Sequence, residues 1–176
     1  MSEHIVLLRG VNLGPHNRLS MAAFSAVLAE AGASEVRTYI QSGNAVCRIP
    51  ADKLDTFALW VAAELSARHG VRTPVVLRTA AELAQTVANN PYPGEEDQLF
   101  VAFLADLPTP EQVASLDPQR SPGDRFSVVG RDVYLHLGNG AAKTKLTNDW
   151  LDRRLRTVST ARNWRTVLAL RAMSGG

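Results

Sequence analysis

The chain has 176 residues, of which 45% are hydrophobic and 20% are charged, with 19 Lys and Arg against 17 Asp and Glu. This composition excludes a disordered chain and fits a soluble protein with one large domain or two small ones. No apolar run approaches the roughly 18 residues of a membrane helix, and no signal peptide precedes the first strand-like run, so we expect a cytoplasmic protein without a membrane partner. Cys47 is the only cysteine, so we expect no internal disulfide, which fits a reducing compartment.

The first half of the sequence predicts the element order β-α-β-β-α-β. We expect a strand in residues 4–11 that stops at Gly10, a loop to Leu19, a helix from Ser20 to about Glu30, two strands in residues 34–50, a helix from Pro50 or Asp52 to Gly70, and a strand from Thr73 to Arg78. Ser42 and Gly43 suit the hairpin between the paired strands. This order is the ferredoxin-like split βαβ arrangement.

The second half predicts a similar order. We expect a helix with a Thr79–Glu82 capping box, a loop in residues 91–97, a strand in residues 98–105, a short helix from Thr109, a hairpin in residues 124–137 that turns near Gly130, a helix capped by Thr147, and a last helix from Ser159 or Thr160 to about Met173. Here the final strand of the first half is replaced by a helix. We therefore expect an α/β (α+β) protein with two ferredoxin-like βαββαβ-type halves, antiparallel or mixed sheets, helices packed on them, and a C-terminal helix.

The predicted halves are residues 1–79 and 80–176, and the alternative is one single domain over 1–176.

Four polar segments interrupt these otherwise amphipathic elements: LRGVNLG, YIQSGNAV, LHLGNGAAKTKLTN and TARNWRTV. They predict one composite polar site built from loops that are distant in sequence. Residues 143–171 also carry eight Lys and Arg against two Asp. Such a surface either attracts anions or consists of solvated basic helix faces.

Two of the segments belong to the first half. Arg9 and Asn12 belong to a loop that is bounded by glycines. Either this loop presents backbone amide groups to a phosphate or carboxylate, or it is a turn in which Asn12 hydrogen-bonds to local backbone groups. Asn44 stands at a hairpin tip, where it either contributes to the polar site or is present only because the turn geometry favours Asn.

The other two segments belong to the second half. GNGAAKTK is not a nucleoside triphosphate loop, because Ala142 stands where a glycine must precede the lysine. Lys143 and Lys145 either bind an anion beside the helix capped by Thr147 or form a solvated basic loop. Arg162 and Asn163 are expected near the start of the last helix, with Arg162 directed to the site.

Metal and cofactor sites are not expected. The four His residues have no metal-ligand spacing. His136 either points into the polar site or is a hydrogen-bonded structural histidine. The catalytic residues are unknown, because Ser42 lacks a nucleophile motif and no general base is evident.

The motifs LLRGVNLG, RTYIQSGNAV, VVLRTAAEL, VYLHLGNGAAKTKLTN and TARNWRTVLAL occur in this order between about Ile5 and Leu170. Together they resemble bacterial proteins of the domain-of-unknown-function family 1697. The resemblance implies a compact α/β protein with ferredoxin-like halves and brings no established activity. The sequence PHNR in the first loop departs from the expected pattern of a second Gly and a Lys, which weakens a functional role for Asn17 or Arg18.

Three hypotheses for function follow. The first is non-catalytic binding of a phosphorylated or anionic ligand, such as a nucleotide, in a cleft between the halves. The second is an enzyme that acts on a phosphorylated small molecule there, and the third is a structural or oligomerisation protein, monomeric or homodimeric. Nucleic acid is a weaker partner, because exposed aromatic pairs for base stacking are missing. The proposed ligand-binding residues are Arg9, Asn12, Asn44, Lys143, Lys145, Arg162 and Asn163.

Overall fold

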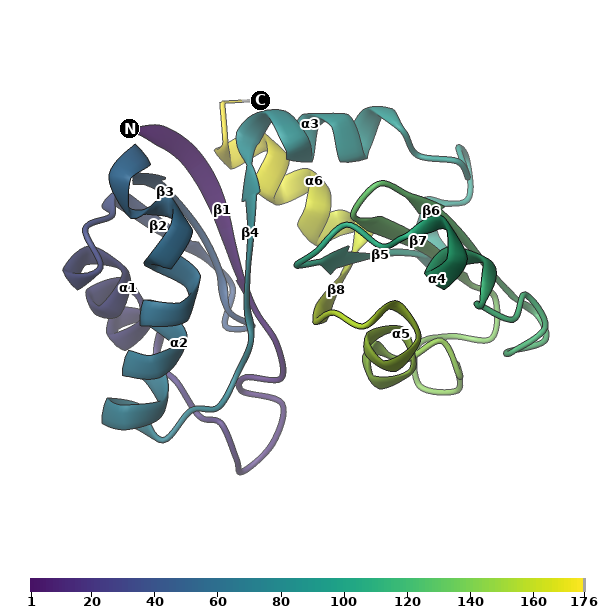
Figure 1. Ribbon diagram of the computed structural model, residues 1–176, viewed down its shortest axis with the longest axis horizontal. Coiled ribbons are helices and arrows are strands. Elements are labelled where there is room, and N and C mark those ends of the chain that lie inside the picture. The colour runs from purple at the N-terminus through teal and green to yellow at the C-terminus, as the bar shows by residue number, and fades with distance from the viewer. Residues whose placement is uncertain (176) are drawn as a thin grey trace. The chain divides into compact units, whose positions relative to one another are not determined.

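The computed structural model describes residues 1–175, so Gly176, the last residue of the predicted second half, lies outside the described residues. The chain forms two compact units (Figure 1). The first unit is Met1–Ala84 together with the residues from Ala169 onward, and the second unit is Gln85–Leu168. The division falls inside two helices, α3 (Ala80–Ala88) and α6 (Trp164–Met173), whereas the sequence suggested a boundary after residue 79. That suggested boundary stays a prediction.

The first unit contains one four-stranded antiparallel sheet, called here the first sheet. Its strands have the order β2-β3-β1-β4. The elements are β1 (Ser2–Leu8), α1 (Met21–Glu30), β2 (Ser34–Tyr39), β3 (Asn44–Ile49), the 3₁₀ turn η1 (Ala51–Lys53), α2 (Leu54–His69) and β4 (Val75–Thr79). The element order is the one predicted from the sequence.

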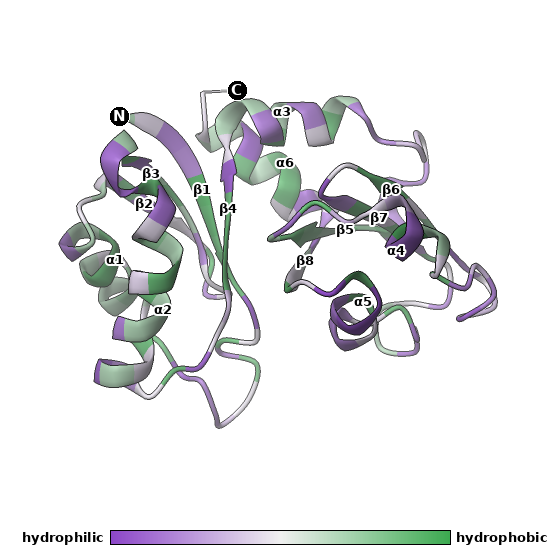
Figure 2. Cartoon of the chain, in the orientation of Figure 1, coloured by the Kyte–Doolittle hydropathy of each residue, from purple (hydrophilic) through white to green (hydrophobic). Residues whose placement is uncertain are grey.

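The central strand β1 of the first sheet is buried on both faces from Ile5 to Leu8. Val6 and Leu8 pack with residues of α1 and α2, such as Phe24 and Val61, in one core cluster. Ile5 and Leu7 alternate with them and are also fully buried. This two-sided burial explains why β1 is a continuous apolar run, and Figure 2 shows β1 and β4 hydrophobic along much of their length.

The second unit repeats this topology in a second antiparallel sheet. Its strands have the order β6-β7-β5-β8. The elements are the 3₁₀ turn η2 (Glu96–Gln98), β5 (Leu99–Leu104), α4 (Pro110–Ala114), β6 (Asp124–Val129), β7 (Asp132–Leu137), α5 (Asn148–Leu155) and β8 (Ser159–Asn163). Helix α5 contributes Trp150 and Leu151 to the core of this unit, which includes Ala102 and Leu135 of the sheet.

One prediction about the second half is wrong. Residues Ser159–Asn163 were expected to begin the last helix, but they form β8, which pairs with β5 from Leu104↔Ser159 to Phe100↔Asn163. Helix α6 begins only at Trp164. The polar sequence STARN resembles a capped helix start, but pairing with the buried strand β5 satisfies its backbone and outweighs local propensity. Arg162 is therefore a strand residue, and it does not share a helix face with Thr166.

With this correction the two units have the same element order, and each last strand is followed directly by a helix. Thr79 caps α3 through a reciprocal pair of hydrogen bonds with Glu82, and Asn163 caps α6 by accepting from the Thr166 backbone N–H at 2.9 Å. The fold class predicted from the sequence, a mixed α and β protein with two sheets and a C-terminal helix, is confirmed. Over residues 1–175, none of the helices has the length and apolarity needed to cross a membrane.

Candidate functional site

The residues proposed from the sequence fall into two groups. Arg9, Asn12 and Asn44 belong to the first unit. The second group lies in the second unit and comprises Lys143, Lys145, Arg162 and Asn163. Each group is described within its own unit.

In the first unit, Asn12 joins the loop after β1 to the turn between β2 and β3. Its side-chain Nδ2 donates to the carbonyl oxygens of Leu19 and Gln41, at 2.8 and 2.6 Å, and its Oδ1 accepts from the Leu19 N–H at 2.8 Å. The backbone of Asn12 is left-handed, with φ of 58°, which Asn tolerates better than most residues. Asn12 therefore fixes the shape of both loops.

Two further contacts attach the segment before β4 to the same place. The Thr73 hydroxyl accepts from the backbone N–H of Arg9 and donates to its carbonyl, both at 2.8 Å. The side chain of Asn17 accepts from the Arg72 N–H at 3.2 Å and donates to the Arg72 carbonyl at 2.9 Å. Residues 9–20, 40–43 and 70–74 thus form one hydrogen-bonded loop cluster at the end of the first sheet, called here the loop cluster.

Asn44 and Gly43 stabilise the hairpin within this loop cluster. The amide of Asn44 is fully buried and donates to the Tyr39 carbonyl and the Ser42 hydroxyl, at 3.1 and 3.0 Å. Gly43 has φ of 80°, and a Cβ there would lie 2.7 Å from the Cβ of Leu8. Only glycine fits this position without displacing β1.

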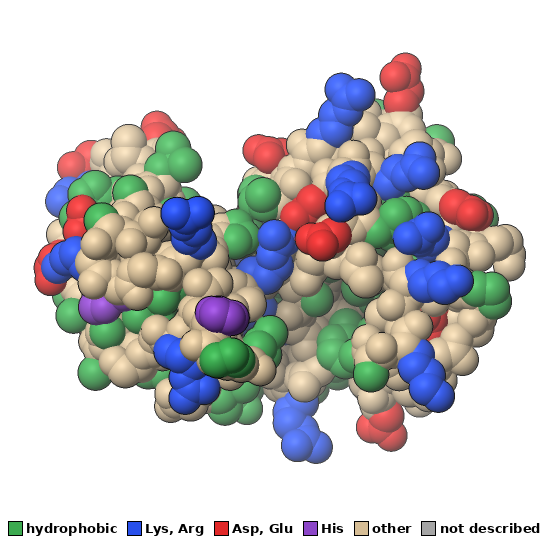
Figure 3. Space-filling view, turned by 90° about the horizontal axis from the view of Figure 1, so that it is seen from below, with side chains coloured by type: hydrophobic (Ala, Val, Ile, Leu, Met, Phe, Trp, Pro, Cys, Tyr) green, Lys and Arg blue, Asp and Glu red, His purple; other side chains and the backbone are tan. Residues whose placement is uncertain are grey.

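The loop cluster carries cations and no Asp or Glu. Residues 9–20 contain Arg9, His16 and Arg18, residues 70–74 contain Arg72, and residues 40–43 contain no charged side chain. Arg18 and Arg72 are exposed, and neither guanidinium forms an ion pair with another residue among 1–175. Figure 3, which is seen from below and so from the side of these loops, shows blue side chains and a His here, with red side chains of this unit near its outer margin.

A surface pocket of about 460 Å³ opens in the loop cluster. Its lining residues are Asn12, Arg18, Leu19, Ser20 and Gln41. Helix α1 begins beside it: the Ser20 hydroxyl accepts from the Ala23 N–H, and the first turn contains no acidic residue. The partial positive charge of a helix N-terminus therefore adds to that of the arginines.

In the second unit, Lys143 and Lys145 are exposed, and neither ammonium group has an ion-pair partner in the part of the chain described. Their loop is bound to the segment before β6, because the Lys145 N–H donates to the Ser121 hydroxyl at 3.1 Å. Asp124 accepts from the Asn139 N–H and from Ser121. Burial alone would raise the pKa of Asp124, but these hydrogen bonds outweigh it and lower the pKa.

Arg162 is a buried residue of β8. Burial lowers the pKa of its guanidinium to about 10, and one nitrogen donates to the Thr160 hydroxyl at 2.7 Å and to the Ala161 carbonyl at 2.9 Å. Its strand neighbour Ala161 packs in the core beneath α5, so the side chain of Arg162 lies on the opposite face of the second sheet. No described contact joins Arg162 to Lys143 or Lys145.

His136 is a buried residue of β7 with unusual surroundings. Its Nε2 lies 2.9 Å from the Glu95 carboxylate, within ion-pair distance, but neither ring nitrogen makes a directed hydrogen bond within residues 1–175. The ring stands 5.5 Å from that of Tyr92. The described residues contain no group of three His, Cys, Asp or Glu side chains that could hold a metal ion.

The sequence interpretation missed Arg72 and Gln41, and it set Arg18 aside. The available signal was the lack of acidic residues in three separate segments, two of which carry arginines. That signal becomes meaningful only when the segments are known to be adjacent.

Comparisons with known proteins give a family and a fold. The model of the family described as "Protein of unknown function (DUF1697)" matches residues 1–134. The conserved bacterial protein SP0830 from Streptococcus pneumoniae has a similar structure, with a TM-score of 0.72 and 20% sequence identity over 100% of this chain and 99% of that one. No curated protein matches the sequence. The family match spans most of the chain, so this protein belongs to the DUF1697 family, whose function is unknown.

Proposed function

We propose that the protein binds a small anionic ligand, such as a phosphorylated metabolite or nucleotide, at the loop cluster of the first unit, without reacting with it. The observation that carries the proposal is a cluster of three hydrogen-bonded segments that contains three arginines, on two of the segments, and no acidic residue. Because Arg18 and Arg72 have no ion-pair partner among residues 1–175, an anion would be their natural counter-charge.

The geometry favours binding over a purely structural role for Arg18 and Arg72. Structural arginines are usually paired or packed, whereas these two are exposed and their backbones are held in place by Asn12, Asn17 and Thr73. A site that is already ordered loses little conformational entropy when a ligand binds.

The pocket and the helix start supply the remaining contacts. Ser20 and Gln41 line the pocket with a hydroxyl and an amide side chain, and α1 presents its first N–H groups beside them. Phosphate oxygens are well matched to guanidinium groups and helix N-termini. The second-unit residues Lys143, Lys145, Arg162 and Asn163 are not needed for this proposal.

The test is calorimetric titration and thermal-shift measurement with pyrophosphate, ATP and a sugar phosphate. Native protein should be stabilised by at least one of these compounds by mass action. Arg18→Gln and Arg72→Gln should each weaken binding about tenfold, since one charge-assisted contact is worth roughly 1.4 kcal/mol. Without ligand, both variants should melt within about a degree of the native protein, because exposed side chains contribute little to stability.

Arg153→Gln is the matched control, because Arg153 is an exposed arginine on α5 of the second unit. It should leave affinity unchanged. The proposal fails if none of the three compounds binds at millimolar concentration, or if Arg153→Gln weakens binding as much as Arg18→Gln does.

A further inference from the structure

Strand β6 is an edge strand of the second sheet, and its outer side is open. It pairs only with β7, in an unbroken register from Asp124↔Leu137 to Val129↔Asp132. An edge strand presents backbone donors and acceptors that can pair with another extended chain.

The turn between β6 and β7 shows which backbone groups point outward. Gly130 and Arg131 form a two-residue turn, and Gly130 has φ of 59°. In two-residue hairpins the flanking residues, here Val129 and Asp132, hydrogen-bond to each other, so alternate residues of the strand face its partner. The N–H and C=O groups of Phe126 and Val128 therefore face away from β7.

Asp124 supports this assignment. Asp124, Phe126 and Val128 are alternate residues of the strand, so their backbone N–H and C=O groups point to the same side. The N–H of Asp124 donates to the Ser121 carbonyl at 3.0 Å, outside the sheet. For Phe126 and Val128, no such hydrogen bond exists among the described residues.

Strand β6 lacks the bulge that protects the edge strand β2. Strand β2, an edge of the first sheet, has a register shift between Ser34 and Arg37 and a left-handed Glu35 with φ of 52°. Such bulges prevent further pairing. Strand β6 has no bulge, no proline and no lysine.

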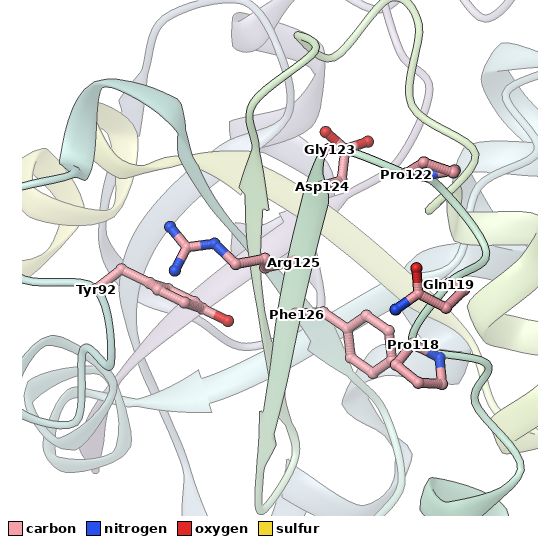
Figure 4. A pocket seen from close by; sticks show the side chains of 8 residues that line it. All are labelled: Tyr92, Pro118, Gln119, Pro122, Gly123, Asp124, Arg125 and Phe126. Atoms are coloured by element: carbon pink, nitrogen blue, oxygen red, sulfur yellow. The ribbon is translucent and has the colours of Figure 1, made fainter.

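A pocket of about 570 Å³ lies along this edge (Figure 4). Figure 4 shows Arg125 and Tyr92 on one side of the strand and Phe126, Pro118 and Gln119 on the other. The guanidinium of Arg125 lies 5.0 Å from the centre of the Tyr92 ring, and the Tyr92 hydroxyl lies 3.0 Å from that of Ser127. The pocket thus offers an aromatic and proline wall where a side chain of an added strand would project.

The surroundings of the edge are basic. The exposed cations are Arg120, Arg125, Lys143 and Lys145, the last two on the loop bound to Ser121. The neighbouring acids are Glu95, which is paired with Arg125, the exposed Asp117, and Asp124, which lies on β6, lines the pocket and accepts hydrogen bonds from Ser121 and Asn139. Lys143 and Lys145, which have no ion-pair partner among residues 1–175, favour a segment that carries Asp or Glu.

We propose that β6 accepts an extended acidic polypeptide segment as a fifth strand of the second sheet, with one large apolar side chain in the pocket beside Phe126 and Pro118. Main-chain hydrogen bonds to Phe126 and Val128 give the register, and the pocket and the cations give the selectivity. This inference concerns the second unit alone and stands independently of the proposed anion site.

The test uses a capped heptapeptide that alternates glutamate with valine and has one central phenylalanine. Amide hydrogen exchange is followed by NMR on the full chain, with and without the peptide. Before addition, the amides of Phe126 and Val128 should exchange freely, while those of Arg125 and Ser127 are protected. Addition should slow exchange at Phe126 and Val128 at least tenfold.

Two altered peptides separate strand addition from simple charge attraction. N-methylation of the alternate amides that face β6 should abolish protection, since it removes the main-chain donors and leaves every side chain. Exchanging glutamate for lysine should weaken binding about tenfold. Arg125→Gln should weaken binding similarly, and Arg153→Gln should not.

The proposal is overturned if the peptide does not bind at millimolar concentration or if the N-methylated peptide binds equally well. It is also overturned if the amides of Phe126 and Val128 are already protected in the free protein, because that would mean the edge is covered by something else, such as a second copy of the chain.

Discussion

Arg78 and Arg162 occupy equivalent positions in the two sheets. Arg78 pairs with Ile5 across β4 and β1, and Arg162 pairs with Val101 across β8 and β5. Both side chains are buried, with exposed fractions of 2% and 8%, and each is followed by the residue that caps the next helix. The internal repeat therefore includes the helix after each last strand, although the two halves share little sequence.

Arg162→Ala should lower the free energy of unfolding by about 2 to 4 kcal/mol, because it removes a large buried side chain. Arg162→Met should recover much of this loss, since methionine refills the space without a desolvated charge. Urea denaturation of both variants measures the effect. A loss below about 0.5 kcal/mol in the alanine variant would show that Arg162 is not part of the scaffold and would return it to the ligand-binding candidates.

Cys47 should be unreactive and should give an alkaline dependence of stability. Burial raises the pKa of its thiol from 9.0 to about 12, with the charge of Glu3 as a smaller cause. The unfolded chain therefore loses this proton first, so stability falls as the pH rises above 9, by about 1.4 kcal/mol at pH 10. Urea unfolding at pH 8 and pH 10 checks this, and Cys47→Ala should reduce the difference by that amount.

Burial also raises the pKa of Tyr134 from its ordinary value of 10.0, but this group is present in both the native protein and Cys47→Ala, so its contribution cancels in their comparison. If the native protein and Cys47→Ala lose the same stability between pH 8 and pH 10, the thiol is not shielded as described.

Gly43→Ala should destabilise the protein by more than about 2 kcal/mol, since it combines left-handed strain with a clash against β1. Gly140→Ala is the matched control. Gly140 has a similar φ of 85°, but a Cβ there would have no neighbour within 4 Å. The control should lose only about 1 kcal/mol in thermal or urea unfolding. Equal losses would mean that close packing against Leu8 is not the reason for glycine at position 43.

Asn12→Asp should lower the free energy of unfolding by about 2 to 3 kcal/mol. The substitution keeps the shape and tolerates the left-handed backbone, but it replaces a donor with a charged acceptor facing the carbonyls of Leu19 and Gln41. Limited proteolysis should then cut the loop in residues 10–19 faster than in the native protein. Unchanged proteolysis and stability would show that Asn12 does not hold the two loops together.

Much of the local structure could be predicted from the sequence. Ser20, Thr79 and Thr147 each accept the hydrogen bond expected of a helix cap, and Gly70 ends α2 with φ of 64°. These predictions succeed because capping and left-handed termini depend on residues within a few positions of each other.

The failures come from long-range contacts. The segment Ser159–Asn163 is a strand only because β5 offers it an unpaired side, and Arg162 is buried for the same reason. Neither fact is encoded in the local pattern, which contains a cap residue and several polar side chains. Asn12 likewise could not be told apart from a ligand-binding residue until its partners, Leu19 and Gln41, were known.

The sequence by itself determined most of the elements and their order, and it identified the residues of the polar segments, because hydrophobic periodicity and turn chemistry act locally. The tertiary structure decided which of those segments meet. It joined the loops of Arg9, Asn12 and Arg72 into one cluster without acids, and it separated Arg162 from Lys143 and Lys145 by the thickness of a sheet. Charge acts over distances in space, and only the fold sets those distances.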